Sequence, residues 1–152
     1  KILYLLKHDK MNIRIITNMF TMDKVGEFTL APCAFMCMFS VRGKYLDLML
    51  IQRSQDAIAA NSINVCQYAF LQIMFASVSN LKAGKLTHVI NNFHIYDRHI
   101  PIAEELLSRE EYEKPTLHVN TKVKNFYDFT VDDFKLENYQ CGEQIKNIPI
   151  AI

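Results

Sequence analysis

The stretch from Phe35 to Leu50, FMCMFSVRGKYLDLML, indicates the fold class of this sequence. Residues 35–41 are apolar on both faces, as in a buried strand, and Arg-Gly-Lys at 42–44 is typical of a tight turn. After the turn, Leu46, Leu48 and Leu50 alternate with more mixed neighbours, which is the period of a second strand. The stretch therefore predicts a β-hairpin.

A change of period follows the hairpin. From Asn64 to Asn80, apolar residues recur at three- and four-residue spacing, and large apolar residues also occupy the opposite side. This pattern predicts a helix that is buried nearly all round, with Asn64 as the candidate cap. The apolar run 68–78 is shorter than the ~20 residues that span a bilayer, so it belongs in a protein core.

The other elements are predicted from shorter patterns. We expect strands over 13–20 and 87–95, a helix over 100–110 with Pro101 in its first turn, short strands over 116–119, 126–129 and 134–139, and a turn ending at Gly84. Strands outnumber helices in this mixture, which predicts an α+β fold.

Composition excludes several classes of partner. The chain has 152 residues, half of them hydrophobic, with 17 Lys plus Arg against 16 Asp plus Glu. Because the charges balance and the basic residues are scattered, no nucleic-acid-binding face is indicated and DNA is not an expected partner. A small anionic ligand fits, since it needs only two or three placed arginines.

Cysteine usage points to a reducing compartment. The four cysteines form no CxxC pair and have no His at zinc-finger spacing, so we expect no metal site. They are too few for a disulfide scaffold. No charged leader followed by an apolar stretch opens the chain, so neither a secretory signal nor a membrane partner is expected. The simplest interpretation is a cytoplasmic protein.

Three motifs are candidates for chemistry. In Ala31-Pro32-Cys33, a cysteine stands directly before the buried strand, where positive charge nearby would make it a nucleophile. The segment Gln52 to Asp56, QRSQD, offers an Arg and a Ser to a phosphate. In His94-Ile95-Tyr96, the His and Tyr share one strand face and suit a sugar hydroxyl. Taken singly, each motif favours a structural role: a core cysteine, a solvated strand end, or a satisfied interior pair.

Taken together, the motifs resemble thymidylate synthase. The resemblance is carried by Ile-Thr-Asn at 16–18, Ala-Pro-Cys at 31–33, Gln-Arg-Ser-x-Asp at 52–56, Asn64, Gln-Tyr-Ala at 67–69, His-Ile-Tyr at 94–96 and Pro-x-Ala-Ile at 149–152. The spacing between these blocks also matches, from about Asn12 onward. Residues 96–101 and 126–129 are similar to the branch found in some Gram-positive bacteria.

The resemblance implies a fold and a reaction. The fold is a mixed β-sheet packed with a buried central helix and smaller helices. Residues 1–152 would form a single domain, the C-terminal part of a thymidylate synthase-like domain lacking its N-terminal segment. The family converts dUMP to dTMP with 5,10-methylenetetrahydrofolate as one-carbon donor and reductant, and uses no metal. Cys33 matches the nucleophile that adds to carbon six of the uracil ring.

The resemblance also implies the roles of the other site residues. Arg53 and Ser54 match the phosphate ligands, Gln55 and Asp56 continue that dUMP-binding segment with Asp56 also touching folate, Asn64 matches the amide that reads the uracil edge, and His94, Ile95 and Tyr96 match the ribose-binding segment. Arg14 matches an arginine that grips the phosphate of the partner subunit in a homodimer. Ala151 matches a folate contact in the C-terminal tail, which closes over bound folate.

Two departures from the family pattern leave alternatives open. Ile13 stands where the first of two interface arginines is expected, and the sequence has no Trp and none of the segment that carries the family's catalytic Glu. We expect a fragment of a working thymidylate synthase. The alternatives are a truncated, non-catalytic relative that serves as a nucleotide-binding or dimerisation scaffold, and a pyrimidine nucleotide hydroxymethylase, which Asn64 does not exclude.

Overall fold

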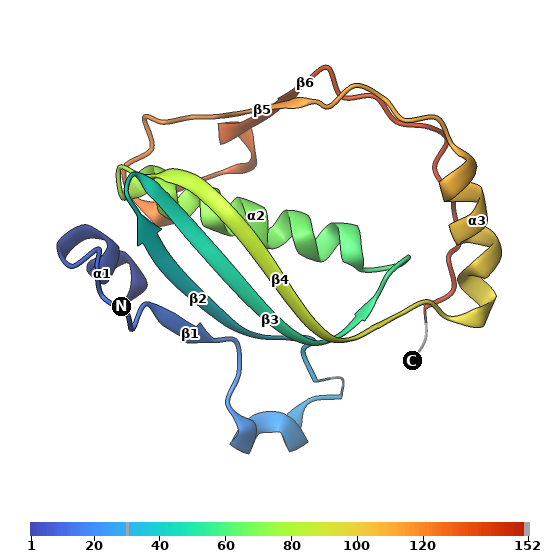
Figure 1. Ribbon diagram of the computed structural model, residues 1–152, viewed down its shortest axis with the longest axis horizontal. Helices are drawn as coiled ribbons and strands as arrows, with labels where there is room; N and C mark the ends of the chain where they lie inside the picture. Colours follow the sequence, from blue (N-terminus) through green and yellow to red (C-terminus); the bar gives the residue numbers. More distant parts are fainter. Residues whose placement is uncertain (30, 151–152) are drawn as a thin grey trace.

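A four-stranded sheet is the framework of the protein, which the computed structural model describes over residues 1–29 and 31–150 (Figure 1). Its strands, in sheet order, are β1 (Ile16–Asn18), β2 (Ala34–Arg42), β3 (Tyr45–Asp56) and β4 (Lys82–His94). The pairs β1–β2 and β2–β3 are antiparallel, whereas β3–β4 is parallel. The sheet is therefore mixed, as expected.

The predicted hairpin is confirmed in β2 and β3. Arg42 pairs with Tyr45, so the connection contains only two residues, Gly43 and Lys44. Gly43 has a φ of 61°, which fits the first central position of a type II′ turn and which an L side chain adopts with strain.

The helix α2 (Asn61–Val78) connects the two parallel strands and lies on one face of the sheet (Figure 1). Beneath it, Leu46, Leu48 and Leu50 of β3 are almost completely buried. Phe39 of β2 meets Phe75 of α2 edge to face, with 5.2 Å between ring centroids. Residues 68–79 contain no exposed position, so the buried helix is confirmed there, whereas its first turns are partly exposed.

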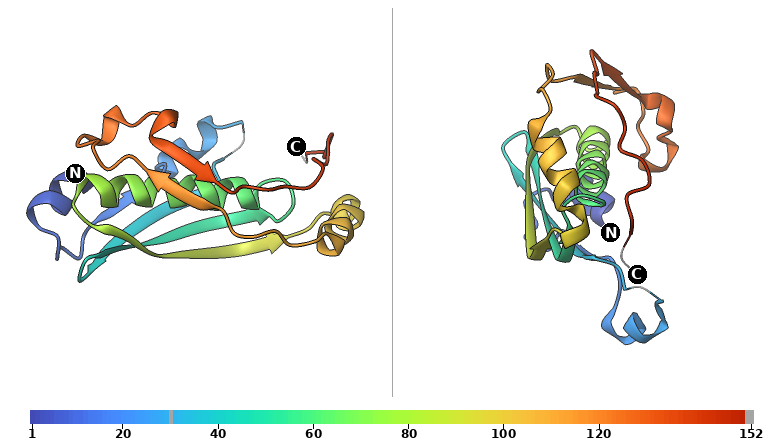
Figure 2. Two further views of the ribbon diagram at one scale, coloured as in Figure 1. Left: turned by 90° about the horizontal axis from the view of Figure 1, so that it is seen from above. Right: turned by 90° about the vertical axis from the view of Figure 1, so that its right-hand side faces the viewer.

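A second layer covers the other side of α2 (Figure 2). The antiparallel pair β5 (Thr116–Val119) and β6 (Phe134–Glu137) supplies it, and Phe134 packs edge to face against Phe70 of α2 at 4.9 Å. The remaining elements are α1 (Ile2–His8), α3 (Ile100–Ser108) and the 3₁₀ turns Met22–Glu27, Asp97–His99, Phe126–Asp128 and Val131–Asp133. None of the helices in the described part of the chain is long and apolar enough to cross a membrane.

Several predicted strand boundaries are wrong because polar side chains end or replace the strand. Near the N-terminus the strand covers only Ile16–Asn18, since the Asn12 side chain accepts the Arg14 backbone N–H at 2.8 Å and forms a turn before it. Residues 126–128 form a 3₁₀ turn instead of a strand, and the Asn125 side chain caps this turn. β6 ends at Glu137, because the next residue has a positive φ of 59°.

Two helix boundaries also differ from the prediction. α2 begins at Asn61, so Asn64 lies inside its first turn and does not cap it. The reason is that the Asp56 carboxylate accepts the N–H groups of Ile58 and Ala59 at 2.9 and 3.1 Å, which turns the chain into the helix earlier. At the other end of the fold, α3 stops at Ser108, two residues before the predicted end.

Gly84 lies within β4, not at the end of a turn, and β4 begins earlier than predicted. A Cβ at Gly84 would collide with Oδ1 of Asp47 and come within 3.0 Å of the Leu46 carbonyl. Asp47 cannot easily move aside, because its Oδ1 accepts the Lys85 N–H at 2.7 Å. Glycine therefore allows β3 and β4 to approach here.

We predict that Gly84→Ala destabilises the protein by about 1–3 kcal/mol, the usual cost of overpacking. Gly26→Ala is the matched control, because nothing lies within 4 Å of a Cβ at that position. Urea unfolding measures both. Equal midpoints for the two variants would contradict the close approach of the strands at Gly84.

Candidate active site

The register of the sheet gathers most of the predicted site residues at one end of it. Ala34, the first residue of β2, pairs with Gln52 near the end of β3. The end of β3 pairs in turn with the end of β4, with Asp56 opposite His94. α2 starts five residues after β3 ends, which brings Asn64 to the same place. Four chain segments with polar or reactive side chains therefore meet at this sheet end.

Arg53 holds the loop that carries Cys33. Its backbone N–H donates to the Cys33 carbonyl at 2.9 Å. Its guanidinium donates to the carbonyls of Pro32 (Nε, 3.2 Å) and Ala31 (Nη2, 2.5 Å). These contacts use two of the five guanidinium N–H groups, so within the described residues the side chain retains donors for an anion. The Arg53 side chain thus lies against the loop that carries the Cys33 thiol.

Cys33 differs from the neighbouring Cys37 in its exposure. Cys33 is half-buried at the site, whereas Cys37 is completely buried beneath α2. Burial raises the pKa of the Cys37 thiol to about 11, so this thiol stays protonated near neutral pH. Cys66 and Cys141 are exposed; Cys66 lies two residues after Asn64 in α2, and Cys141 lies beyond β6 in the C-terminal part of the chain. Cys33 is therefore the thiol that the site offers for nucleophilic chemistry.

A buried amide network lies beneath the site. Gln52 is 1% exposed and its Nε2 donates to the Ser54 carbonyl at 2.8 Å, which identifies that atom as the amide nitrogen. The same nitrogen contacts the side-chain oxygens of Asn64, at 3.3 Å, and of Gln55. The other end, Oε1, faces Nε2 of His88 at 3.1 Å, so the imidazole carries its proton on Nε2. Gln52 thereby orients the amide of Asn64.

Gln52 belongs to the candidate segment 52–56 but was given no role of its own, and His88 was not predicted at all. One signal for Gln52 was available, because it follows Leu46, Leu48 and Leu50 at the same two-residue period and so occupies a core-facing position. A polar residue there needs buried partners. The signal for His88 depends on the pairing of β4 with β3, which sequence periodicity does not supply.

Asp56 ends β3 with its carboxylate shared between two neighbours. Oδ1 accepts the two N–H groups at the start of α2, as described above. Oδ2 lies 3.7 Å from Nδ1 of His99, and the Asp56 side chain remains 15% exposed. The neighbouring Gln55 is 1% exposed, and its Nε2 has no hydrogen-bond partner in the described part of the chain. The Asp56 carboxylate is therefore held in a fixed position at the strand end, and the Gln55 side chain is held by its contact with Gln52.

His94 and Tyr96 lie together at the end of β4. Their rings are edge to face with centroids 4.9 Å apart, and Nδ1 of His94 faces the Asn92 carbonyl at 3.3 Å. The Arg98 guanidinium covers the Tyr96 ring at 4.9 Å. Ile95 between them is exposed. The two polar side chains form one partly exposed surface next to Asp56.

Two predicted residues are not part of this cluster. Arg14 is exposed and precedes β1, next to Ile15, whose carbonyl accepts the Phe39 N–H at 2.9 Å. Phe39 lies six residues along β2 from Cys33, which corresponds to roughly 20 Å of strand at ~3.3 Å per residue. Ala151 lies outside the described residues. The structure therefore separates Arg14 from the other site residues of its own chain.

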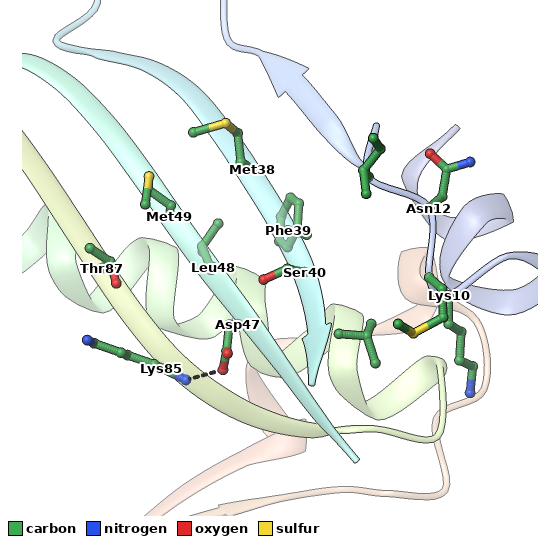
Figure 3. A pocket seen from close by; sticks show the side chains of 13 residues that line it. Lys10, Asn12, Met38, Phe39, Ser40, Asp47, Leu48, Met49, Lys85 and Thr87 are labelled. Carbon is green, nitrogen blue, oxygen red and sulfur yellow. Dashed lines mark hydrogen bonds between the residues drawn. The ribbon is translucent and has the colours of Figure 1, made fainter. Parts of the chain in front are cut away.

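A pocket of about 500 Å³ lies elsewhere, on the sheet face opposite α2 (Figure 3). It contains none of the predicted site residues. Met38 and Met49 form its floor together with Thr87, and these three residues are consecutive partners across β2, β3 and β4. Among the described residues, no three His, Cys, Asp or Glu side chains are grouped to hold a metal.

The partly buried environment of His88 predicts a pH dependence of folding. Burial lowers the pKa of His88 below its ordinary value of 6.5, so the folded protein keeps this ring neutral where the unfolded chain is already protonated. Protons then favour the unfolded state as the pH falls through about 6.5, and stability decreases. We expect the melting temperature to fall between pH 7.5 and 5.5, and to fall less in His88→Gln. An equal decrease in both proteins would contradict this assignment.

Comparison with known proteins identifies the family. The family model described as thymidylate synthase matches residues 1–152. The thymidylate synthase of Clostridium beijerinckii is 39% identical over 148 residues, which cover 96% of this chain and 56% of that protein. Thymidylate synthase 1 of Bacillus subtilis is 38% identical over 144 residues, or 95% and 52% of the two chains. The chain thus spans about half the length of these relatives.

A solved structure agrees with the fold. The structure of thermostable thymidylate synthase A from Bacillus subtilis superposes with a TM-score of 0.90 at 38% identity, covering 95% of this chain and 52% of that one. The relatives from Bacillus and Clostridium confirm the branch that the sequence resembles. Because the family model matches the whole chain and the fold agrees as well, this protein belongs to the thymidylate synthase family.

Proposed function

We propose that the full-length protein is a thymidylate synthase that converts dUMP to dTMP with 5,10-methylenetetrahydrofolate. One observation carries the proposal: the register of β2, β3 and β4 brings Cys33, the segment 53–56 and His94 to the same sheet end, where Asn64 joins them. A thiol, a cationic side chain and an amide are the groups that a nucleotide substrate needs for attack, phosphate binding and base recognition.

In this proposal Cys33 provides the nucleophile. Its thiolate adds to carbon six of the uracil ring, which makes carbon five electron-rich enough to accept a one-carbon unit. Arg53 holds the loop in front of Cys33 by the carbonyls of Ala31 and Pro32, so that loop is in place before substrate arrives. With Ser54, the free guanidinium donors bind the nucleotide phosphate. His94 and Tyr96 take the ribose hydroxyl.

Asn64 reads the base. An amide offers one donor group and one acceptor, which suits the adjacent N–H and C=O of uracil. Its orientation is set by Gln52, whose Nε2 faces the Asn64 oxygen and whose other end is held by His88. Gln55 continues the dUMP-binding segment beside Asp56. An Asn64 amide that Gln52 and His88 hold in one orientation favours a uracil nucleotide as substrate.

The described residues also suit a reduced folate. When bound, the folate supplies the one-carbon unit and the hydride. Asp56 is a partly exposed carboxylate that accepts N–H donors, such as those of a pterin ring or a pyrimidine. The C-terminal tail with Ala151 completes the proposed folate site. No metal takes part in this proposal.

We further propose a homodimer built on the outer sheet face. Ile16, Met49 and Val89 are 42, 37 and 45% exposed on this face, which is large apolar area for a free surface. Arg14 lies beside the same face and away from its own site, as expected of a residue that reaches the partner's phosphate. The four cysteines are free in the described part of the chain, and Cys33 must stay reduced to react, which supports a cytoplasmic location in this proposal.

The test is covalent capture in the full-length protein. With fluoro-dUMP and methylenetetrahydrofolate, we expect a ternary complex that survives denaturing electrophoresis. Cys33→Ser should abolish it, because the Cys33 thiol forms the bond. Cys66→Ser should leave it unchanged, because the exposed Cys66 thiol has no role in the proposed reaction.

Two results would contradict the proposal. Folded protein that forms no complex would indicate a non-catalytic relative, and a complex that persists in Cys33→Ser would place the nucleophile elsewhere. Product identification separates the remaining alternative, since a hydroxymethylase releases hydroxymethyl-dUMP in place of dTMP.

A further inference from the structure

His99 is a completely buried polar residue that none of the proposed roles uses. It ends the 3₁₀ turn before α3 and has 0% exposure. Its Nε2 lies 2.8 Å from the carbonyl oxygen of Pro149, fifty residues further along the chain. Its Nδ1 points to Oδ2 of Asp56 at 3.7 Å and has no hydrogen-bond partner in the described part of the chain. One ring therefore stands between the end of β3 and the C-terminal tail.

The Pro149 carbonyl fixes the role of one ring nitrogen, Nε2. A proline carbonyl only accepts, so Nε2 of His99 must carry the proton and donate it. Nδ1 then faces the carboxylate of Asp56, whose other oxygen is held by two backbone N–H groups. The edge-to-face contact with the Tyr96 ring, at 5.7 Å between centroids, limits rotation of the imidazole. The donor is therefore aimed at Pro149 by its surroundings.

The tail itself has few other attachments. Within the described residues, two side chains hydrogen-bond to its backbone: Arg109 to the Glu143 carbonyl at 2.8 Å, and His99 to that of Pro149. These anchors lie at the two ends of α3, and the tail runs beside this helix (Figure 1). Only the His99 anchor lies next to Asp56. It therefore joins the tail at Pro149 to the end of β3.

We propose that His99 is a positioning residue that fastens the C-terminal tail beside Asp56 and thereby sets the affinity for the folate co-substrate. The consequence for folate rests on the proposed function, which assigns Asp56 and the tail to that ligand. The attachment itself does not rest on it. His99 acts through these two segments and is not a catalytic residue.

Proteolysis tests the attachment without any ligand. Endoproteinase Lys-C cleaves after Lys146 and thereby separates residues 147–152, the segment that includes Pro149, from the rest of the fold. His99→Phe fills the space without a donor, and His99→Asn is too short to reach. Both should release this peptide about tenfold faster, because a lost hydrogen bond of about 1.4 kcal/mol changes an opening equilibrium tenfold. His99→Gln places an amide donor near the position of Nε2 and should stay within about twofold of wild type.

Cleavage after Lys135, within β6, reports general loosening of the fold. The test uses the donor-free variant, His99→Phe or His99→Asn, that is cleaved after Lys135 at the wild-type rate, because its fold is not loosened. An unchanged release of residues 147–152 in that variant would overturn the attachment. An equally fast release in His99→Gln would overturn the hydrogen bond as its cause.

Kinetics of the full-length protein test the consequence. The donor-free variants should raise KM for methylenetetrahydrofolate about tenfold, since the tail-opening equilibrium shifts by the same factor. The Kd for dUMP alone should stay within about twofold of wild type. A parallel loss of dUMP binding would overturn the assignment to folate. A wild-type protein that binds neither ligand would refute the proposed function, whereas the proteolysis result would still decide the role of His99.

Discussion

Pairing of β3 on both edges is the constraint on which the rest of the structure depends. β3 is antiparallel to β2 and parallel to β4, and α2 crosses between the two parallel strands. A shift of one residue would turn Leu46, Leu48 and Leu50 away from α2 and toward the opposite face, at the cost of most of the core. The same register places Cys33, Asp56 and His94 at one sheet end. Burial of the leucines thus also assembles the site.

Buried polar groups hold the site in place at some expense to stability. Gln52, Gln55 and His99 are almost fully buried, and each would lose free energy if its partners were absent. Two of these residues connect segments that are distant in sequence: Gln52 meets His88 of β4, and His99 meets Pro149. The proposed roles of Asn64 in base recognition and of the tail in folate binding would both require a fixed orientation. We therefore infer that the buried polar residues Gln52, Gln55 and His99 serve to position the residues of the site.

Local patterns predicted the local parts of this structure. The hairpin of β2 and β3 and the buried half of α2 follow from period and turn chemistry, and the order of motifs led to the family. Side-chain competition for backbone groups decided the errors, as at Asn125 and at Asp56, which starts α2 three residues early. Long-range partners stayed hidden, because nothing near His99 in the sequence indicates Pro149. The separation of Arg14 from the site likewise required the sheet register.

The central claim is that one sheet end binds a uracil nucleotide, and a crystal structure of the full-length protein with dUMP tests it most directly. The account predicts the phosphate on Arg53 and Ser54, the base against Asn64 with carbon six facing the Cys33 sulfur, and the ribose between His94 and Tyr96. A nucleotide bound instead in the pocket floored by Met38 and Met49, or turned so that carbon six faces away from Cys33, would contradict it.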